Sequence, residues 1–256
     1  MKLLLIVALA AAPLFLGASP APQASDLYAA GKYEDAIAAG LAQNNAQGFV
    51  VSARAALAEE QLRDTPCLDC LKRAESFARR AIAADPSVPE GHIYVAAILG
   101  YEARIVGIVQ ARLNGYPEEA KRQLDEALHL DPGNAWALAA LGGWNIEIVH
   151  RGGAFAAQLL YGANVKTGLD DFGKAFAAQP GNLVLRFQEA LTLSGYDLDA
   201  YRGAIKDGLQ RAASGNPETA YDRAIQARAA SLLKLLQAGN DGTFLVQVRK
   251  YQGYPD

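Results

Sequence analysis

The sequence predicts an all-α protein built as an irregular helical-repeat solenoid, and three observations lead to this fold class. First, 51% of the 256 residues are apolar, and much of this fraction is alanine, the residue with the highest helix propensity. Second, Val, Ile and Thr form few runs, so little in the chain favours strands. Third, one spacing of small residues and proline recurs three times, which is typical of stacked helical repeats.

Length and charge narrow the classes of function. A chain of 256 residues can bury a substantial core, as one or two compact domains or one elongated array. The net charge is −3, and acidic and basic residues are interspersed. Because no polybasic stripe is present to neutralise phosphates, we do not expect nucleic-acid binding.

Residues 1–24 are predicted to be a secretory signal peptide. Lys2 precedes an apolar run from Leu3 to Leu16, and small residues and prolines follow. A run of 14 residues interrupted by Pro13 is short for a membrane-spanning helix, which needs roughly 20. No cysteine follows the run, so a lipoprotein anchor is not expected. We therefore expect a periplasmic or secreted protein without a stable membrane anchor, and leave the cleavage site open.

The repeated pattern marks the second helices of helical hairpins. The segments AESFARRAIAADP, AKRQLDEALHLDP and GLDDFGKAFAAQP begin at Ala74, Ala120 and Gly168. Each places three apolar residues and then a proline at the same four offsets; the first and third are small, and the second is large in two of the three segments. Small residues let two helix backbones approach closely, and the proline ends the helix.

With these residues the chain resembles a tetratricopeptide-repeat (TPR) protein over residues 25–194. After Pro132, Leu138, Leu141 and Gly142 match the first-helix pattern of that family, and AAGKYEDAIAAG is similar to an earlier, degenerate unit. The resemblance implies about four helical pairs with a concave face. TPR arrays use that face to bind peptides, partner helices or other subunits.

Two insertions depart from the regular repeat. Successive prolines are expected about 34 residues apart, but Pro86, Pro132 and Pro180 are separated by 46 and 48 residues. The residues beyond the regular repeat length precede each second helix, so we expect two extended first helices. One covers residues 90–114; the other covers 135–150 and continues in a second piece, 154–163. Twelve extra helical residues would project about 18 Å, which predicts a deep groove or buried slot between the two.

Residues 195–256 are predicted to form a helical cap of the same domain. Amphipathic patterns continue after Pro180 in the segments LDAYRGAIKDGLQRAAS and NPETAYDRAIQARAASLLKLLQ. A terminal repeat needs a polar outer face, and these segments can supply it. The structure of the last 15 residues stays open.

A narrower resemblance covers Leu141–Pro180. A helix with Trp144 and Arg151, then Tyr161–Gly162, then a helix ending before a proline is similar to the helical domain of the regulator of microtubule dynamics family. Members of that family sit at organelle contact sites, and the resemblance implies a phospholipid-binding role. Their membrane anchors and microtubule biology are not expected in an exported protein of bacterial type.

Cys67 and Cys70 form a C-x-x-C pair. In an oxidising compartment, a local disulfide that pins the turn between two helices is the favoured interpretation. Idle thiols, a redox dithiol and a metal site are the alternatives. A redox dithiol would be expected within a β-α-β unit, and a zinc site would need two further ligands; the sequence shows neither.

The sequence offers no catalytic or metal-binding group and implies no cofactor. His92, His129 and His150 are too far apart to share a helix face, and no H-E-x-x-H or G-x-S-x-G motif occurs. We therefore do not expect an enzyme.

The candidate binding residues lie on the two extended helices and the piece that follows the second. Glu147 and Arg151 are four residues apart, a favourable order for an ion pair. The pair could be an ordinary solvated salt bridge, or it could face the slot, where it would tie the helices together or hold a polar headgroup. Gly152–Gly153 is expected to bend the chain so that residues 154–163 cover the groove. The full candidate set is Tyr101, Glu102, Ile105, Trp144, Glu147, Arg151, Phe155 and Tyr161.

Two functions follow from this arrangement. The first is an exported scaffold that binds a protein or peptide partner on its concave face. The alternative is a carrier of an apolar small molecule or lipid, held between the two extended helices. An apolar cavity beside Trp144 would favour the carrier. The sequence predicts neither the partner, the ligand nor the oligomeric state.

Overall fold

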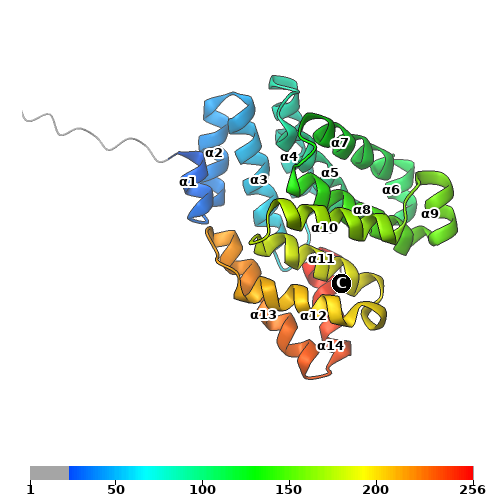
Figure 1. The fold of residues 1–256 in the computed structure, drawn as a ribbon. Helices are drawn as coiled ribbons and strands as arrows, with labels where there is room; N and C mark the ends of the chain where they lie inside the picture. The colour runs from blue at the N-terminus through cyan, green and yellow to red at the C-terminus, as the bar shows by residue number, and fades with distance from the viewer. Residues whose placement is uncertain (1–22, 256) are drawn as a thin grey trace, which may run out of the picture.

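The chain folds into a succession of helices that pack in antiparallel pairs (Figure 1). The computed structural model describes residues 23–255, and these residues contain fourteen α-helices and no strand. The all-α prediction is therefore confirmed for this part of the chain. The predicted signal peptide lies outside the described residues, except for Gln23 and Ala24. In the part of the chain that is described, no helix has both the length and the apolar character needed to cross a bilayer.

The helices follow one another with short connections. They are α1 (Ala24–Ala29), α2 (Tyr33–Gln43), α3 (Ala46–Leu62), α4 (Leu68–Ala84), α5 (Pro89–Val106), α6 (Ile108–Leu113), α7 (Tyr116–Leu130), α8 (Ala135–Gly152), α9 (Ala154–Tyr161), α10 (Val165–Ala178), α11 (Leu183–Tyr196), α12 (Leu198–Ser214), α13 (Ala220–Gln237) and α14 (Asp241–Tyr251). The principal pairs are α1 with α2, α3 with α4, α5 with α7, α8 with α10, and α11 with α12. Each pair also packs on the next, so α3, α5, α8 and α11 succeed one another through the fold.

The three segments with the repeated spacing are the second helices α4, α7 and α10, as predicted. Their small residues sit where helices cross. A Cβ atom on Gly142 of α8 would lie only 2.7 Å from the carbonyl oxygen of Gly168 on α10. Both positions therefore require a residue without a side chain, which is the physical reason for a small residue at the start of the pattern.

One of the two predicted extended helices needs a correction. Helices α5 and α8 each have 18 residues, scarcely more than the 17 of α3. The inserted residues form separate short helices, α6 and α9. The prediction of one continuous helix over residues 90–114 is wrong because Gly107, at φ 82° and ψ 164°, interrupts it. Gly153, at φ 77° and ψ 152°, makes the same bend before α9, as expected for the glycine pair.

The C-terminal helices return to the start of the chain. Helix α13 packs on α11 and α12 and contacts α1, while α14 packs on α13 and α11. The Arg228 guanidinium of α13 donates hydrogen bonds to the carbonyl oxygens of Gln61 and Leu62 at the end of α3, at 2.8 and 3.2 Å. In the last segment, left open by the sequence, the residues up to Tyr251 are helical.

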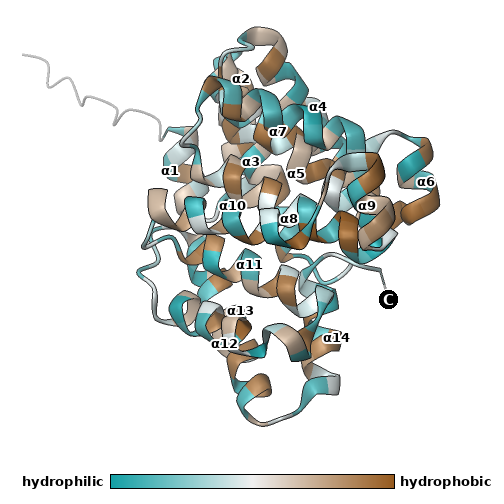
Figure 2. Ribbon diagram, turned by 45° about the vertical axis from the view of Figure 1, so that its right-hand side comes forward, coloured by the Kyte–Doolittle hydropathy of each residue, from teal (hydrophilic) through white to brown (hydrophobic). Residues whose placement is uncertain are grey.

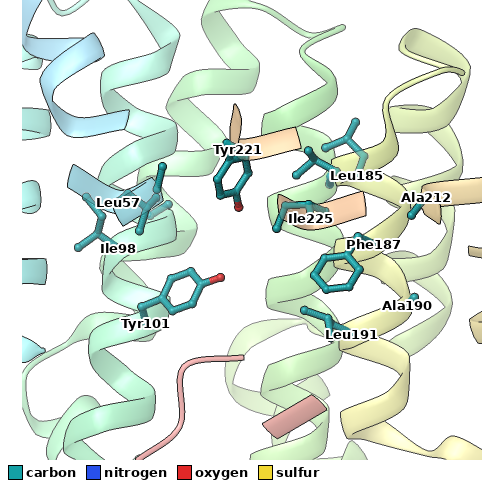
Figure 3. Close-up of a cluster of buried hydrophobic side chains, with 14 of the residues drawn as sticks. Leu57, Ile98, Tyr101, Leu185, Phe187, Ala190, Leu191, Ala212, Tyr221 and Ile225 are labelled. Carbon is teal, nitrogen blue, oxygen red and sulfur yellow. The ribbon is translucent and has the colours of Figure 1, made fainter. Parts of the chain in front are cut away.

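Buried apolar side chains join the C-terminal helices to the earlier ones. In Figure 3, Tyr221 and Ile225 of α13 lie between two groups of core side chains. Leu57 and Ile98 stand on one side of them, and Leu185 stands on the other. The C-terminal part is thus more than an outer cap, since its side chains belong to the same core as those of the earlier helices.

Candidate functional site: a cavity between α5 and α8

A cavity of about 540 Å³ runs along the inner faces of α3, α5, α8 and α11. Much of its wall is apolar; the wall includes Leu57, Ala96, Leu99, Ala139, Ala140 and Leu185. Its volume falls within the range of about 300–1,000 Å³ that small-molecule sites occupy. The slot predicted between the two long first helices is therefore present.

Polar groups line the cavity near both ends of α5. Tyr94 lies in the first half of that helix and Arg104 near its end, and both line the cavity. Ten residues of helix separate them, or about 15 Å. The stretch between them is largely apolar, so the cavity suits an elongated apolar molecule with a polar group at one end.

Near the start of α5, the polar lining centres on Arg54 of α3. Its guanidinium carbon lies 4.1 Å from the centre of the Tyr28 ring. Among the described residues, no carboxylate lies within the 4.0 Å ion-pair distance of Arg54. Burial opposes its charge, but Tyr94, Tyr28 and Asp222 favour it and together hold the pKa of Arg54 above its ordinary value. A half-buried cation without a paired carboxylate is suited to an anionic group.

At the other end, Glu147 connects three elements. It accepts hydrogen bonds from Arg151 Nε at 2.6 Å and from the Tyr254 hydroxyl at 2.9 Å, and Arg104 Nε of α5 lies 3.8 Å away. Burial works to raise the pKa of Glu147, but the two arginines outweigh it and hold that pKa below its usual value. Arg104 also donates to the carbonyl oxygen of Gln252. The charges therefore tie α5, α8 and the C-terminal segment together, as one of the sequence hypotheses proposed.

Trp144 and Tyr161 attach α9 to the rest of the wall. The Trp144 indole donates to the carbonyl oxygen of Pro117 at 3.0 Å, and its ring meets that of Tyr161 edge-on with centroids 6.0 Å apart. The Tyr161 hydroxyl donates to Glu118 of α7 at 3.0 Å. Helix α9 thus covers this part of the cavity, as expected for residues 154–163, although it does so mainly through Ala156, Ala157 and Leu160.

Five of the eight candidate residues line the cavity: Tyr101, Trp144, Glu147, Arg151 and Tyr161. Three do not. Glu102 is buried on the opposite side of α5, towards α4 and α7, where burial raises the pKa of its carboxyl. Ile105 packs against the core instead of facing the cavity. Phe155 is 82% exposed and points away from the groove that it was expected to cover.

Sequence reasoning missed the polar groups that come from outside the two long helices. Arg54, Tyr28 and Tyr221 belong to α3, α1 and α13. Only Arg54 carried a signal, as one charged residue within the alanine-rich segment VSARAALA. Tyr221 could not be placed from the sequence because its hydroxyl donates to Gln61, 160 residues earlier in the chain, at 2.7 Å.

The C-x-x-C pair is a disulfide in the structure, as the favoured interpretation predicted. Cys67 caps α4, and its N–H donates to Glu60 of α3 at 2.5 Å, so the bond fixes the turn between the two helices. His92 is also structural. Its ring nitrogens lie 2.6 Å from the Gln123 side-chain oxygen and 3.0 Å from the carbonyl oxygen of Pro86, so the ring connects α7 to the turn after α4.

The family model of the regulator of microtubule dynamics proteins 1-3 matches residues 23–237, which is most of the chain. This chain belongs to that family. The resemblance noted over Leu141–Pro180 therefore extends to almost the whole helical array. The match ends before α14, which begins at Asp241. A search of the curated proteins found no match.

Proposed function

We propose that this protein is a carrier that holds an elongated apolar molecule with an anionic group, such as a single-chain lipid, in the cavity between α5 and α8. The observation that carries the proposal is the cavity of about 540 Å³ itself, with an apolar middle and arginines towards both ends. No chemical step is needed for such a role, so the proposal includes no enzymatic activity. The phospholipid-binding role implied by the family resemblance agrees with it.

The anionic group has two candidate partners, and the structure favours one. Arg104 and Arg151 already share the carboxylate of Glu147, so each has an anionic partner although the cluster keeps a net charge of +1. Arg54 lies against the Tyr28 ring, and neither Glu90 nor Asp222, the two acids in this part of the cavity wall, forms an ion pair with it. A carboxylate or phosphate head therefore gains most by lying beside Arg54, with its chain directed towards Trp144.

A scaffold function is the second candidate. The stacked pairs and the repeated spacing in α4, α7 and α10 support a TPR-like array. We also propose that the protein is exported and of bacterial type, on the basis of the predicted signal peptide. However, α13 and the residues after α14 occupy the concave side where a TPR array would receive its partner. A protein partner would therefore need another surface.

Gly100 offers a direct test of the carrier. It lies within α5 and lines the cavity, and a Cβ added to it would meet no atom within 4 Å. Gly100→Leu should fill the cavity without harming the helix, because leucine is a better helix former than glycine. Gly173→Leu is the matched control: Gly173 is an exposed residue of α10 with equally open space around it.

The measurement is native mass spectrometry of protein purified from its own host, together with uptake of a fluorescent fatty acid. We expect the wild-type protein and Gly173→Leu to carry and take up ligand, and Gly100→Leu to lose at least tenfold in uptake with unchanged circular dichroism. An empty wild-type protein that takes up no fatty acid would refute the carrier. A defined co-purifying protein partner in its place would support the scaffold.

A further inference from the structure

Helices α6 and α9 carry an unusual share of the exposed apolar surface. Nine large apolar side chains are exposed among residues 23–255, and six of them lie on these two short helices: Ile108, Val109, Leu113, Phe155, Leu159 and Leu160. Leu113 is 76% exposed and Phe155 is 82% exposed. Single exposed apolar residues are normal, but a cluster of this kind marks an interaction surface.

The two helices are built alike and lie together. Each is the inserted piece that follows a long first helix, and each begins after a glycine with the same positive-φ bend. Figures 1 and 2 place α6 and α9 at the same end of the molecule, and Figure 2 shows apolar residues on both. Both also line the cavity, α6 through Ala111 and Arg112, α9 through Ala157 and Leu160. The apolar surface therefore borders the cavity.

The only charged side chain on α6 and α9 is the cation Arg112. Of the cations in the flanking residues, Arg104 and Arg151 share Glu147, and Lys166 pairs with Asp170. Arg112 is exposed, and among the described residues it takes part in no ion pair. The acid closest in sequence to α6 is Glu118 of α7, which accepts the hydrogen bond from Tyr161. Exposed apolar side chains beside a cation that forms no ion pair are suited to an anionic lipid surface.

We infer that the surface formed by Ile108, Val109, Leu113, Phe155, Leu159 and Leu160 docks the protein on an anionic lipid bilayer. The apolar side chains would enter the boundary between headgroups and acyl chains, and Arg112 would lie among the headgroups. The inference deepens the proposed carrier function and rests on it, because docking here brings the bilayer against the border of the cavity, where an apolar ligand can pass without crossing water.

Vesicle flotation tests this surface separately from the cavity. The probes are vesicles of phosphatidylcholine alone and of phosphatidylcholine with 30% phosphatidylserine. The variant Val109→Ser/Phe155→Ser/Leu159→Ser removes three exposed side chains, none of which lines the cavity. The matched control is Leu245→Ser/Val246→Ser on α14, which removes exposed apolar side chains at a different site.

We expect the wild-type protein and the α14 control to float with the anionic vesicles at least tenfold more than with the neutral ones. The triple variant should lose at least tenfold in binding while its fatty-acid uptake from detergent stays unchanged. Equal binding by the triple variant and the wild type, or no binding by the wild type, would overturn the inference. A wild-type dimer that the triple variant converts to a monomer would assign the surface to a second copy and also overturn it. If the wild-type protein binds the anionic vesicles but takes up no fatty acid, the result would contradict the carrier function and leave the docking surface standing.

Discussion

Glu147 is the anion shared by two half-buried arginines, so its replacement should have a measurable cost. Glu147→Gln keeps the shape of the side chain but removes its charge. A hydrogen bond to a charged group contributes about 1.5–3 kcal/mol, and Glu147 accepts two of them. Its side chain is 23% exposed, so water recovers part of the loss, and glutamine can still accept one bond. Since Arg104 and Arg151 would then face each other without an anion, we expect a net loss of about 2–3 kcal/mol.

The assay is urea denaturation at pH 7, followed by circular dichroism. Asp170→Asn is the control, because it weakens an exposed pair with Lys166 on α10 and should cost less than about 0.5 kcal/mol. The pKa of Glu147 is lowered in the folded state, so its contribution is present above the ordinary carboxyl pKa near 4.5 and is lost as the pH falls through the folded value. The difference between Glu147→Gln and the wild type should therefore shrink below about pH 4. A loss at pH 7 no larger than that of the control would refute the reasoning, as would a difference that does not change with pH.

Two further predictions concern α11 and the disulfide. Burial raises the pKa of Glu189 to about 7, Asp207 adds to this effect and Arg186 opposes it. Because the pKa of Glu189 is raised in the folded state, the wild-type protein loses stability as the pH rises through 7. Glu189→Gln should therefore be about 1–3 kcal/mol more stable than the wild type at pH 8 and no more stable at pH 4. Urea denaturation at the two pH values measures this difference. Cys67 and Cys70 close a loop of only four residues, so reduction should cost about 2 kcal/mol, seen as a lower melting temperature with a phosphine reductant and in Cys67→Ser/Cys70→Ser. Identical pH profiles would contradict the first prediction, and an unchanged melting temperature the second.

The second helices were predictable because their signal is local. The spacing that starts at Ala74, Ala120 and Gly168 records where a neighbouring helix backbone passes, and a helix imposes the same offsets wherever it occurs. The disulfide was predictable for a similar reason, since a C-x-x-C pair at a helix start is close enough to bond. Both features depend on a few adjacent residues.

The faces of the long helices were harder to predict. Tyr101 and Glu102 are neighbours in sequence but lie about 100° apart around α5, and both are buried. When a helix is covered on all sides, apolar periodicity does not show which side borders the cavity. The break at Gly107 was missed because the residues on both sides of it continue an apolar helical pattern. Contacts such as Gln61 with Tyr221 join distant parts of the chain, and no local pattern records them.

The contact between α13 and the first helices changes how the molecule should unfold. In an open row of repeats, each pair is held only by its neighbours, so the ends fray while the middle stays folded. Here α1 touches α13, and Arg228 holds the end of α3, so the row closes on itself and neither end is free. The amide hydrogens of α1, α2 and α13 should therefore exchange nearly as slowly as those of the central helices. We therefore expect the protein to unfold cooperatively, as a globular domain does, and to lack the elasticity of an open repeat array.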